Sequence, residues 1–149
     1  MKKLVALFAV ATVGALAFSA LSGAAGKAVT WKATLTSAQE IPKQVVKMAA
    51  AHGSFTGTVS GTKLKWTLTY SKLTGKATAA HIHLGGMGKA GNVLVPLCGA
   101  APACKSGLSG SFKLTPALKA AFGKHLLYVN VHTAKNPNGE IRGQLSAGK

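Results

Sequence analysis

The chain has 149 residues, with 18 Lys+Arg against only 2 Asp+Glu, which gives a formal net charge of +16. This length is typical of one domain, and the 48% hydrophobic residues are enough to build a core. There is no Asp, and the only acidic residues are Glu40 and Glu140. Glycosidase-type carboxylate pairs, Asp-rich calcium loops and catalytic triads that contain Asp are therefore disfavoured.

The N-terminus predicts an export signal. A short basic segment, Met1-Lys2-Lys3, precedes an uncharged apolar run over residues 4–21, and small residues follow as far as Ala28. This order is typical of a secretory signal peptide. We expect residues 1–28 to be the signal peptide and residues 29–149 to be the domain, with no transmembrane segment in the mature protein. A retained membrane anchor is the alternative, because about 18 apolar residues are near the lower limit of a membrane span.

The charge of the mature chain indicates the kind of partner. Removal of residues 1–28 takes three lysines with it and leaves a formal charge of about +13. An exported protein meets phospholipid head groups and acidic envelope polymers, so an anionic envelope ligand or a protein is the expected partner, and nucleic acid is not. The lysines are scattered singly, so the alternative is a cationic surface without a specific ligand.

Period-two alternation of apolar and polar residues dominates the mature chain. Residues 29–36 and 64–70 alternate most clearly, and turn signals such as Asn136-Pro137-Asn138-Gly139 separate the segments. Further strands are predicted over residues 54–60, 77–83, 92–97, 110–114, 126–132 and 140–145. Seven to nine short strands predict an all-β, antiparallel Greek-key β-sandwich or flattened barrel. The predicted core includes Trp31, Leu35, Phe55, Leu64, Trp66, Leu68, Ile82, Val129, Val131 and Ile141.

Two local features interrupt the strands. Cys98 and Cys104 enclose a five-residue segment with Gly and Pro, and in an exported protein they predict a disulfide that closes a small loop. A redox-active or metal-binding pair is the alternative, but the CxxC spacing is absent. Residues 116–122 predict a short helix, with Thr115 as its N-cap and Gly123 at its end.

Five histidines are the obvious reactive groups of the chain. In a strand, His81 and His83 point to the same face, about 6.5–7 Å apart. On the predicted strand 126–132, His132 shares the outward, polar face with Tyr128 and Asn130. If the two strands are neighbours, three imidazoles gather at one point and provide a transition-metal site, with copper as the first candidate. The alternative is a structural role, in which the imidazoles hydrogen-bond the backbone of loops. His52 and His125 lie outside this pattern.

The two carboxylates are interpreted as structural. Glu140 is two residues before Arg142, the only arginine, so in a strand both would share a face and could form an ion pair. We expect each glutamate either to form a structural ion pair or to accept hydrogen bonds from the backbone, and Glu40, Glu140 and Arg142 to support the site rather than to take part in catalysis.

Several stretches resemble the hallmarks of the CHRD domain family. The first is Ala80-His81-Ile82-His83, followed by a glycine-rich loop and residues 91–97; the second joins residues 128–133 to residues 136–145. Residues 35–42 and 53–68 match the start of the family pattern, so the resemblance covers about residues 29–146. The family is named for repeats in chordin, an extracellular antagonist of bone morphogenetic proteins. Its bacterial single-domain members are exported and mostly have no assigned activity, so the resemblance implies the fold and the location.

A weaker resemblance is to copper–zinc superoxide dismutase. That family has a Greek-key β-barrel, a His-x-His strand and a later Val-His strand that bind copper, and an arginine near the metal. His81, His83, His132 and Arg142 occur in the same order here. The bridging histidine and the zinc ligands have no counterpart, and the zinc Asp is absent. The resemblance implies a lone copper site rather than a binuclear enzyme.

The sequence thus predicts an exported CHRD-domain protein that acts as a non-catalytic binding or structural module of the cell envelope or the extracellular space. The alternative is a mononuclear copper-binding protein, with His81, His83 and His132 as ligands and with superoxide-related redox activity. No residue is assigned to catalysis, and copper is the only cofactor considered.

Overall fold

The computed structural model describes residues 27–46 and 49–148. The elements within these residues are β1 (Val29–Thr36), η1 (Ser37–Gln39), β2 (His52–Ser60), β3 (Lys63–Ser71), β4 (Ala77–Leu84), β5 (Val93–Cys98), β6 (Leu108–Lys113), α1 (Pro116–Gly123), β7 (Leu127–Thr133), β8 (Ile141–Gln144) and β9 (Ser146–Ala147). The predicted signal peptide lies outside the described residues except for its last two, so the boundary after residue 28 stays a prediction.

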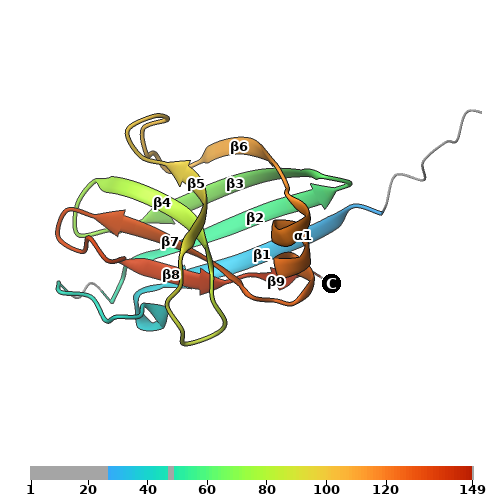
Figure 1. Cartoon of the computed structure of the whole chain (residues 1–149). Helices are drawn as coiled ribbons and strands as arrows, with labels where there is room; N and C mark the ends of the chain where they lie inside the picture. Colours follow the sequence, from blue (N-terminus) through green and yellow to red (C-terminus); the bar gives the residue numbers. More distant parts are fainter. Residues whose placement is uncertain (1–26, 47–48, 149) are drawn as a thin grey trace, which may run out of the picture.

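The strands form one antiparallel sheet that is rolled into a nearly closed barrel (Figure 1). Its path is β5-β4-β7-β8-β1-β2-β3-β6, and β9 pairs with β1. Strand β3 pairs with β6 and not with β4, and β8 returns to β1, so several neighbours in space are far apart in the chain. The all-β prediction is confirmed, and of the two predicted forms the structure is a barrel, which is nearly closed.

Alternation along the strands fills the barrel with apolar side chains. In β3, Trp66 is 8% exposed while Lys65 points to solvent, as the predicted register requires. All ten predicted core residues are buried. Each large apolar side chain contributes about 1.5–3 kcal/mol on burial, so these residues account for much of the driving force for folding.

Helix α1 packs against the barrel at β1. The backbone N–H of Leu118 donates to the Thr115 hydroxyl oxygen (3.1 Å), so Thr115 is the N-cap that the sequence predicts. The ring of Phe122 contacts that of Trp31, with 5.1 Å between the centroids. The helix ends at Gly123, but the left-handed residue that follows is His125 (φ 55°) and not a glycine.

A loop covers the outer face of the sheet where β4, β7 and β8 lie side by side. Residues 85–92 connect β4 to β5 and fold back over this face. The Arg142 side chain donates from Nη2 to the carbonyl oxygens of Gly86 (3.0 Å) and Lys89 (2.8 Å). As a result Tyr128 and Asn130 are each only 3% exposed. The sequence predicts correctly that they point away from the core, but not that they are covered.

The predicted disulfide between Cys98 and Cys104 is confirmed. It closes the loop that follows β5, and within this loop Gly99 N–H donates to the Pro102 carbonyl oxygen (2.9 Å). Among the described residues, no helix has the length and apolar character needed to cross a membrane.

Candidate metal site

Pairing of β4 with β7 brings three histidines together on the outer face of the barrel. The register places Ala79 opposite His132 and His81 opposite Asn130, so His132 is the diagonal neighbour of His81. The ring centroids are 4.9 Å apart for His81 and His132, 5.4 Å for His81 and His83, and 6.2 Å for His83 and His132. One nitrogen from each ring can be chosen so that all three lie within 4.8 Å of one another.

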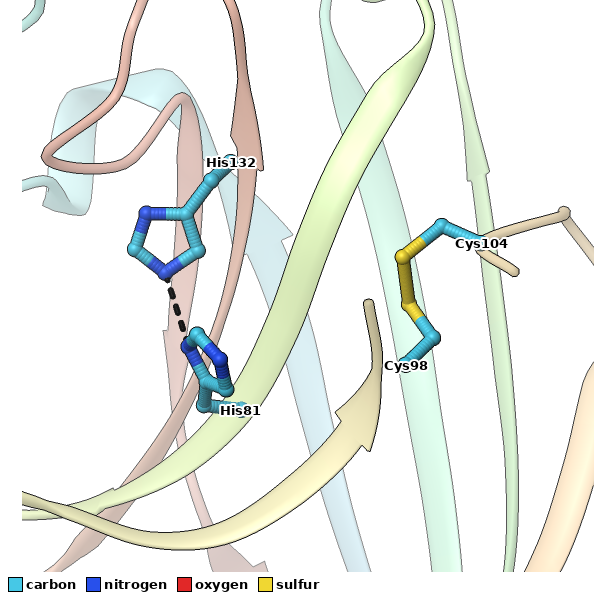
Figure 2. Close-up of a disulfide and its surroundings, with 4 residues drawn as sticks. All are labelled: His81, Cys98, Cys104 and His132. Atoms are coloured by element: carbon cyan, nitrogen blue, oxygen red, sulfur yellow. Dashed lines mark hydrogen bonds between the residues drawn. A yellow bond between two sulfur atoms is a disulfide. The ribbon is translucent and has the colours of Figure 1, made fainter. Parts of the chain in front are cut away.

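Backbone carbonyls fix the protonation of two of these rings. His132 Nδ1 donates to the Pro137 carbonyl oxygen (2.9 Å), which leaves the lone pair on Nε2. This lone pair accepts a hydrogen bond from His81 Nδ1 at 3.1 Å (Figure 2). His83 Nδ1 donates to the Gly91 carbonyl oxygen (2.9 Å), so its Nε2 also carries a lone pair. A metal-binding histidine commonly has such a partner on its other nitrogen, because this orients the ring and increases its basicity.

His83 Nε2 is the least satisfied atom of the cluster. The side chain is 8% exposed, and Nε2 is buried without a hydrogen-bond partner. Leaving a buried polar atom unpaired costs about 1–3 kcal/mol, so such an atom calls for an explanation. The Asn130 side-chain oxygen, which acts on His83, is also buried without a partner, so a ligand at Nε2 would satisfy this nitrogen, and so would the Asn130 NH2 group if it faced the ring.

The three imidazoles are held in the neutral form that metal binding requires. Burial lowers the pKa of His81 to about 4, and the neighbouring His132 and His83 rings act in the same direction. Burial also lowers the pKa of His83, against the opposing effect of the Gly91 carbonyl and the Asn130 side chain, and it lowers that of His132 against the Pro137 carbonyl. These rings therefore stay neutral at pH values at which free histidine is already protonated.

The arrangement fits one ion after a small closure of the rings. Three nitrogens at about 2.0–2.1 Å from a metal in trigonal geometry are about 3.5 Å apart. The widest nitrogen separation here is within 4.8 Å, so the rings must approach one another by about 1 Å. His81 must also move its Nδ1 proton to Nε2 if Nδ1 is to become a ligand. His81 lines a hollow of about 260 Å³ together with residues 96–102, so the site has an open side.

Tyr128 and Arg142 support the His83 ring from behind. The rings of His83 and Tyr128 are stacked, with centroids 4.8 Å apart and planes at 13°. The Arg142 guanidinium lies on the other side of Tyr128, with Cζ at 3.5 Å from the ring centroid. Arg142 is 2% exposed. It therefore belongs to the support of the site, and the hollow of about 220 Å³ that it lines with Met87 and Gln144 is separate from the one that His81 lines.

Of the two roles expected for Glu140, the ion pair with Arg142 is wrong, and the role of backbone acceptor is confirmed by the Thr74 N–H, which donates to its carboxylate. Glu140 precedes the first residue of β8, so strand alternation does not place it beside Arg142. Its carboxylate instead accepts hydrogen bonds from Thr74, Thr133 and Asn136. Burial raises the pKa of Glu140, but these hydrogen bonds outweigh it and hold the pKa below the usual value.

Glu40 is the carboxylate whose pKa the Arg142 charge affects, and burial has the largest effect on that pKa. The side chain is 1% exposed, and Oε1 has no hydrogen-bond partner. Burial raises its pKa to about 8, although the charges of Arg142 and Lys43 and the Ile41 N–H lower it. Hydrogen bonds therefore determine the direction of the pKa shift of Glu140, and burial determines that of Glu40.

The two remaining histidines are outside the cluster. His52 hydrogen-bonds the Ala50 carbonyl oxygen at 2.8 Å and the Ser71 hydroxyl at 3.0 Å, and His125 packs against Trp31. Among the described residues, His81, His83 and His132 are the one group of three potential ligands that lies close enough for a metal ion.

The predicted alternative, in which the imidazoles hydrogen-bond loop backbones, is confirmed for His83 at Gly91 and for His132 at Pro137, whereas sequence reasoning missed the stacking of Tyr128 on His83. For Gly91 a signal was present, because glycines crowd the segment after His83, and only a residue without Cβ fits there. A Cβ at Gly91 would lie 1.5 Å from the Leu84 carbonyl oxygen.

These features define an antiparallel β-barrel protein with a cluster of three histidines on its outer face. In comparison with known families, residues 31–145 match the CHRD domain. The matched stretch includes most of β1, all of β2–β8 and α1, and the chain therefore belongs to the CHRD domain family. No curated protein and no solved structure matches the chain.

Proposed function

We propose that this CHRD-domain protein is an exported, non-catalytic copper-binding module in which His81, His83 and His132 hold one copper ion. The observation that carries the proposal is the His83 Nε2 atom, which is buried, unpartnered and part of a three-nitrogen cluster within 4.8 Å. Backbone carbonyls orient the His83 and His132 rings before any metal arrives, which reduces the ordering cost of binding.

Copper is favoured by the chemistry of the ligands. All three donors are neutral imidazoles, and neither Glu40 nor Glu140 belongs to the cluster. Imidazole suits copper, zinc, iron and nickel, and among divalent first-row ions copper binds most tightly to a given nitrogen site. Calcium and magnesium, which require oxygen ligands, do not fit this donor set.

A binding role is favoured over superoxide chemistry by the position of Arg142. In the resemblance to copper–zinc superoxide dismutase, the arginine lies near the metal. Here the Arg142 guanidinium is stacked on Tyr128, and its Nη2 donates to two loop carbonyl oxygens. It is therefore engaged beneath the 85–92 loop and is not presented to an anion at the open side of the site. The non-catalytic role would be contradicted if the copper-loaded protein consumed superoxide at a rate well above that of the metal-free protein.

Export is supported by two observations. The segment before residue 29 has the order of a signal peptide. Both cysteines of the chain form a disulfide, which is typical of oxidising compartments outside the cytoplasm. The basic surface would then face the anionic components of the envelope.

The test is a titration of the metal-free protein with Cu(II), followed by EPR. We expect one equivalent to bind, with nitrogen couplings from several imidazoles. The variants His81→Ala, His83→Ala and His132→Ala should each lose this signature, and His52→Ala and His125→Asn should retain it. Circular dichroism establishes that each variant is folded. If the three cluster variants bind copper as the parent does, the cluster is structural and the proposal is wrong.

A further inference from the structure

A broad hollow lies beside the disulfide. Its volume is about 680 Å³, and it is formed by the end of β3, the 71–78 segment and residues 99–106. Tyr70, Leu73 and Cys104 give it an apolar floor, since each is partly buried and packs against the core. We refer to it below as the disulfide hollow.

Every charged group around the disulfide hollow is positive. Lys72, Lys76 and Lys105 are exposed at its border, and none of its lining residues is acidic. Neither carboxylate of the chain lines this hollow; Glu140 is buried behind the 71–78 segment, where the Thr74 N–H and hydroxyl donate to it. An apolar floor inside a uniformly positive border is complementary to an acidic chain that also carries an apolar side chain.

The disulfide hollow adjoins the open side of the histidine cluster. Gly99 and Ala100 line both this hollow and the smaller one that His81 reaches. Cys98 is paired across the sheet with Ala80, the inward-facing residue before His81, so the disulfide and the His81 ring lie on opposite sides of β4, the strand that carries two of the three ligands (Figure 2). A partner seated in the disulfide hollow would therefore reach the His81 hollow by passing over Gly99 and Ala100.

We propose that the two adjoining hollows are the docking surface for an acidic, copper-carrying protein that passes its ion to His81, His83 and His132. This inference rests on the proposed function. The transfer is a ligand exchange, in which bonds from copper to the partner's donors break as bonds to the three imidazole nitrogens form. The oxidation state of copper does not change. The His81 proton moves from Nδ1 to Nε2, so this protein releases no net proton, and the partner's donors take up any protons that copper had displaced from them.

The experiment compares two Cu(II)-loaded peptides that share a Gly-His-Gly-His-Gly centre. One is flanked on each side by two glutamates, and the other by two glutamines. Transfer to the full metal-free protein is followed by stopped-flow absorbance. Electrostatic steering changes association rates by about 10–10³-fold. We expect transfer from the glutamate peptide to be at least about 10-fold faster at low salt, and the difference to vanish near 1 M salt, where screening acts over about 3 Å.

Two charge-matched variants locate the surface. The variant Lys72→Glu/Lys76→Glu/Lys105→Glu should lose the preference for the glutamate peptide. The control Lys63→Glu/Lys65→Glu/Lys113→Glu has the same change in net charge, but its residues lie at the opposite end of β3 or on β6, and it should retain the preference. Equilibrium copper affinity, measured against a small chelator, should be the same for both variants and the parent.

The outcomes separate the two proposals. If the parent binds no copper from the chelator, the proposed function fails; binding of the metal-free glutamate peptide, followed by NMR, then reports on the surface alone. If copper binds but both variants respond alike to the two peptides, the docking surface is wrong. If the Lys72/Lys76/Lys105 variant loses only its binding to phosphatidylglycerol vesicles, the hollow is a lipid contact and the inference is overturned.

Discussion

Gly91→Ala is a sharp perturbation of the candidate site, because this residue carries no ligand atom. A Cβ at this position would lie 1.5 Å from the Leu84 carbonyl oxygen, whereas carbon–oxygen contacts between backbone segments are normally about 3.3 Å. The two segments must therefore separate by about 1.8 Å. Leu84 N–H donates to the Asn92 carbonyl oxygen (2.9 Å), so the segments are tied together and cannot part freely.

The displacement breaks the support of His83. The Gly91 carbonyl oxygen accepts from His83 Nδ1 at 2.9 Å, and the Gly91 N–H donates to the Tyr128 hydroxyl at 3.2 Å. A shift of this size moves both contacts beyond hydrogen-bond distance, which ends at about 3.5 Å. Loss of such an orienting partner lowers metal affinity about 10–100-fold, or about 1.4–2.7 kcal/mol. The free energy of unfolding of the metal-free protein should fall by about 1–3 kcal/mol.

Copper affinity is measured by competition with a chelator, and stability by urea unfolding. Gly86→Ala is the matched control, since a Cβ at Gly86 has its nearest neighbour at 3.9 Å, the Cδ2 atom of Leu126. Gly86→Ala should change neither quantity by much. If folded Gly91→Ala binds copper as tightly as the parent, the inferred support of His83 by the loop is wrong. If its stability is also unchanged, the loop does not lie against Leu84 as described.

Three further predictions address charge and covalent structure. Because burial raises the pKa of Glu40 from 4.5 to about 8, its contribution to stability is full below pH 4.5 and is lost as the pH rises through 8. The free energy of unfolding of Glu40→Gln, relative to that of the parent, should therefore rise between pH 5 and pH 9 by at most about 5 kcal/mol, measured by urea unfolding. If the difference between variant and parent is the same at pH 5 and at pH 9, this reasoning is wrong. Because burial lowers the pKa of His81 to about 4, NMR should place its titration near that value, and its contribution to stability should be lost as the pH falls from 6.5 towards 4; a midpoint near 6.5 would show that the ring is open to water. Replacing Cys98 and Cys104 by serine should lower the free energy of unfolding by about 2 kcal/mol, as expected for a short closed loop, and an unchanged value in urea would refute the cross-link's contribution.

The barrel could be predicted because its cause is local. Alternation over residues 29–36 and 64–70 decides which side chains face inward, and a register slip by one residue would put Lys65 in the core and Trp66 in water. The N-cap at Thr115 and the Cys98–Cys104 disulfide could also be predicted, because each joins residues that are close in the sequence; the two cysteines are only 6 positions apart.

The histidine site could be predicted only in part. The His-x-His spacing requires that His81 and His83 share a face of β4, whatever lies beside it. The third histidine is 51 residues from His81, and the choice of β7 as the neighbour of β4 is a property of the whole sheet. The sequence offered His132 as a ligand on the condition that the two strands are adjacent, and the structure meets that condition.

By itself, then, the sequence determined the period of the strands, the side of each strand that enters the core, and the presence of a disulfide and a His-x-His pair. Only the tertiary structure decided that the 85–92 loop covers Tyr128 and Asn130, that Gly91 and Pro137 hold the imidazoles, and that Glu140 binds threonines instead of Arg142. The physical reason is the sequence distance over which each property is determined. Side-chain direction follows from neighbouring backbone angles, whereas burial and hydrogen-bond partners on the outer face depend on where a distant loop returns, and no local pattern encodes that position.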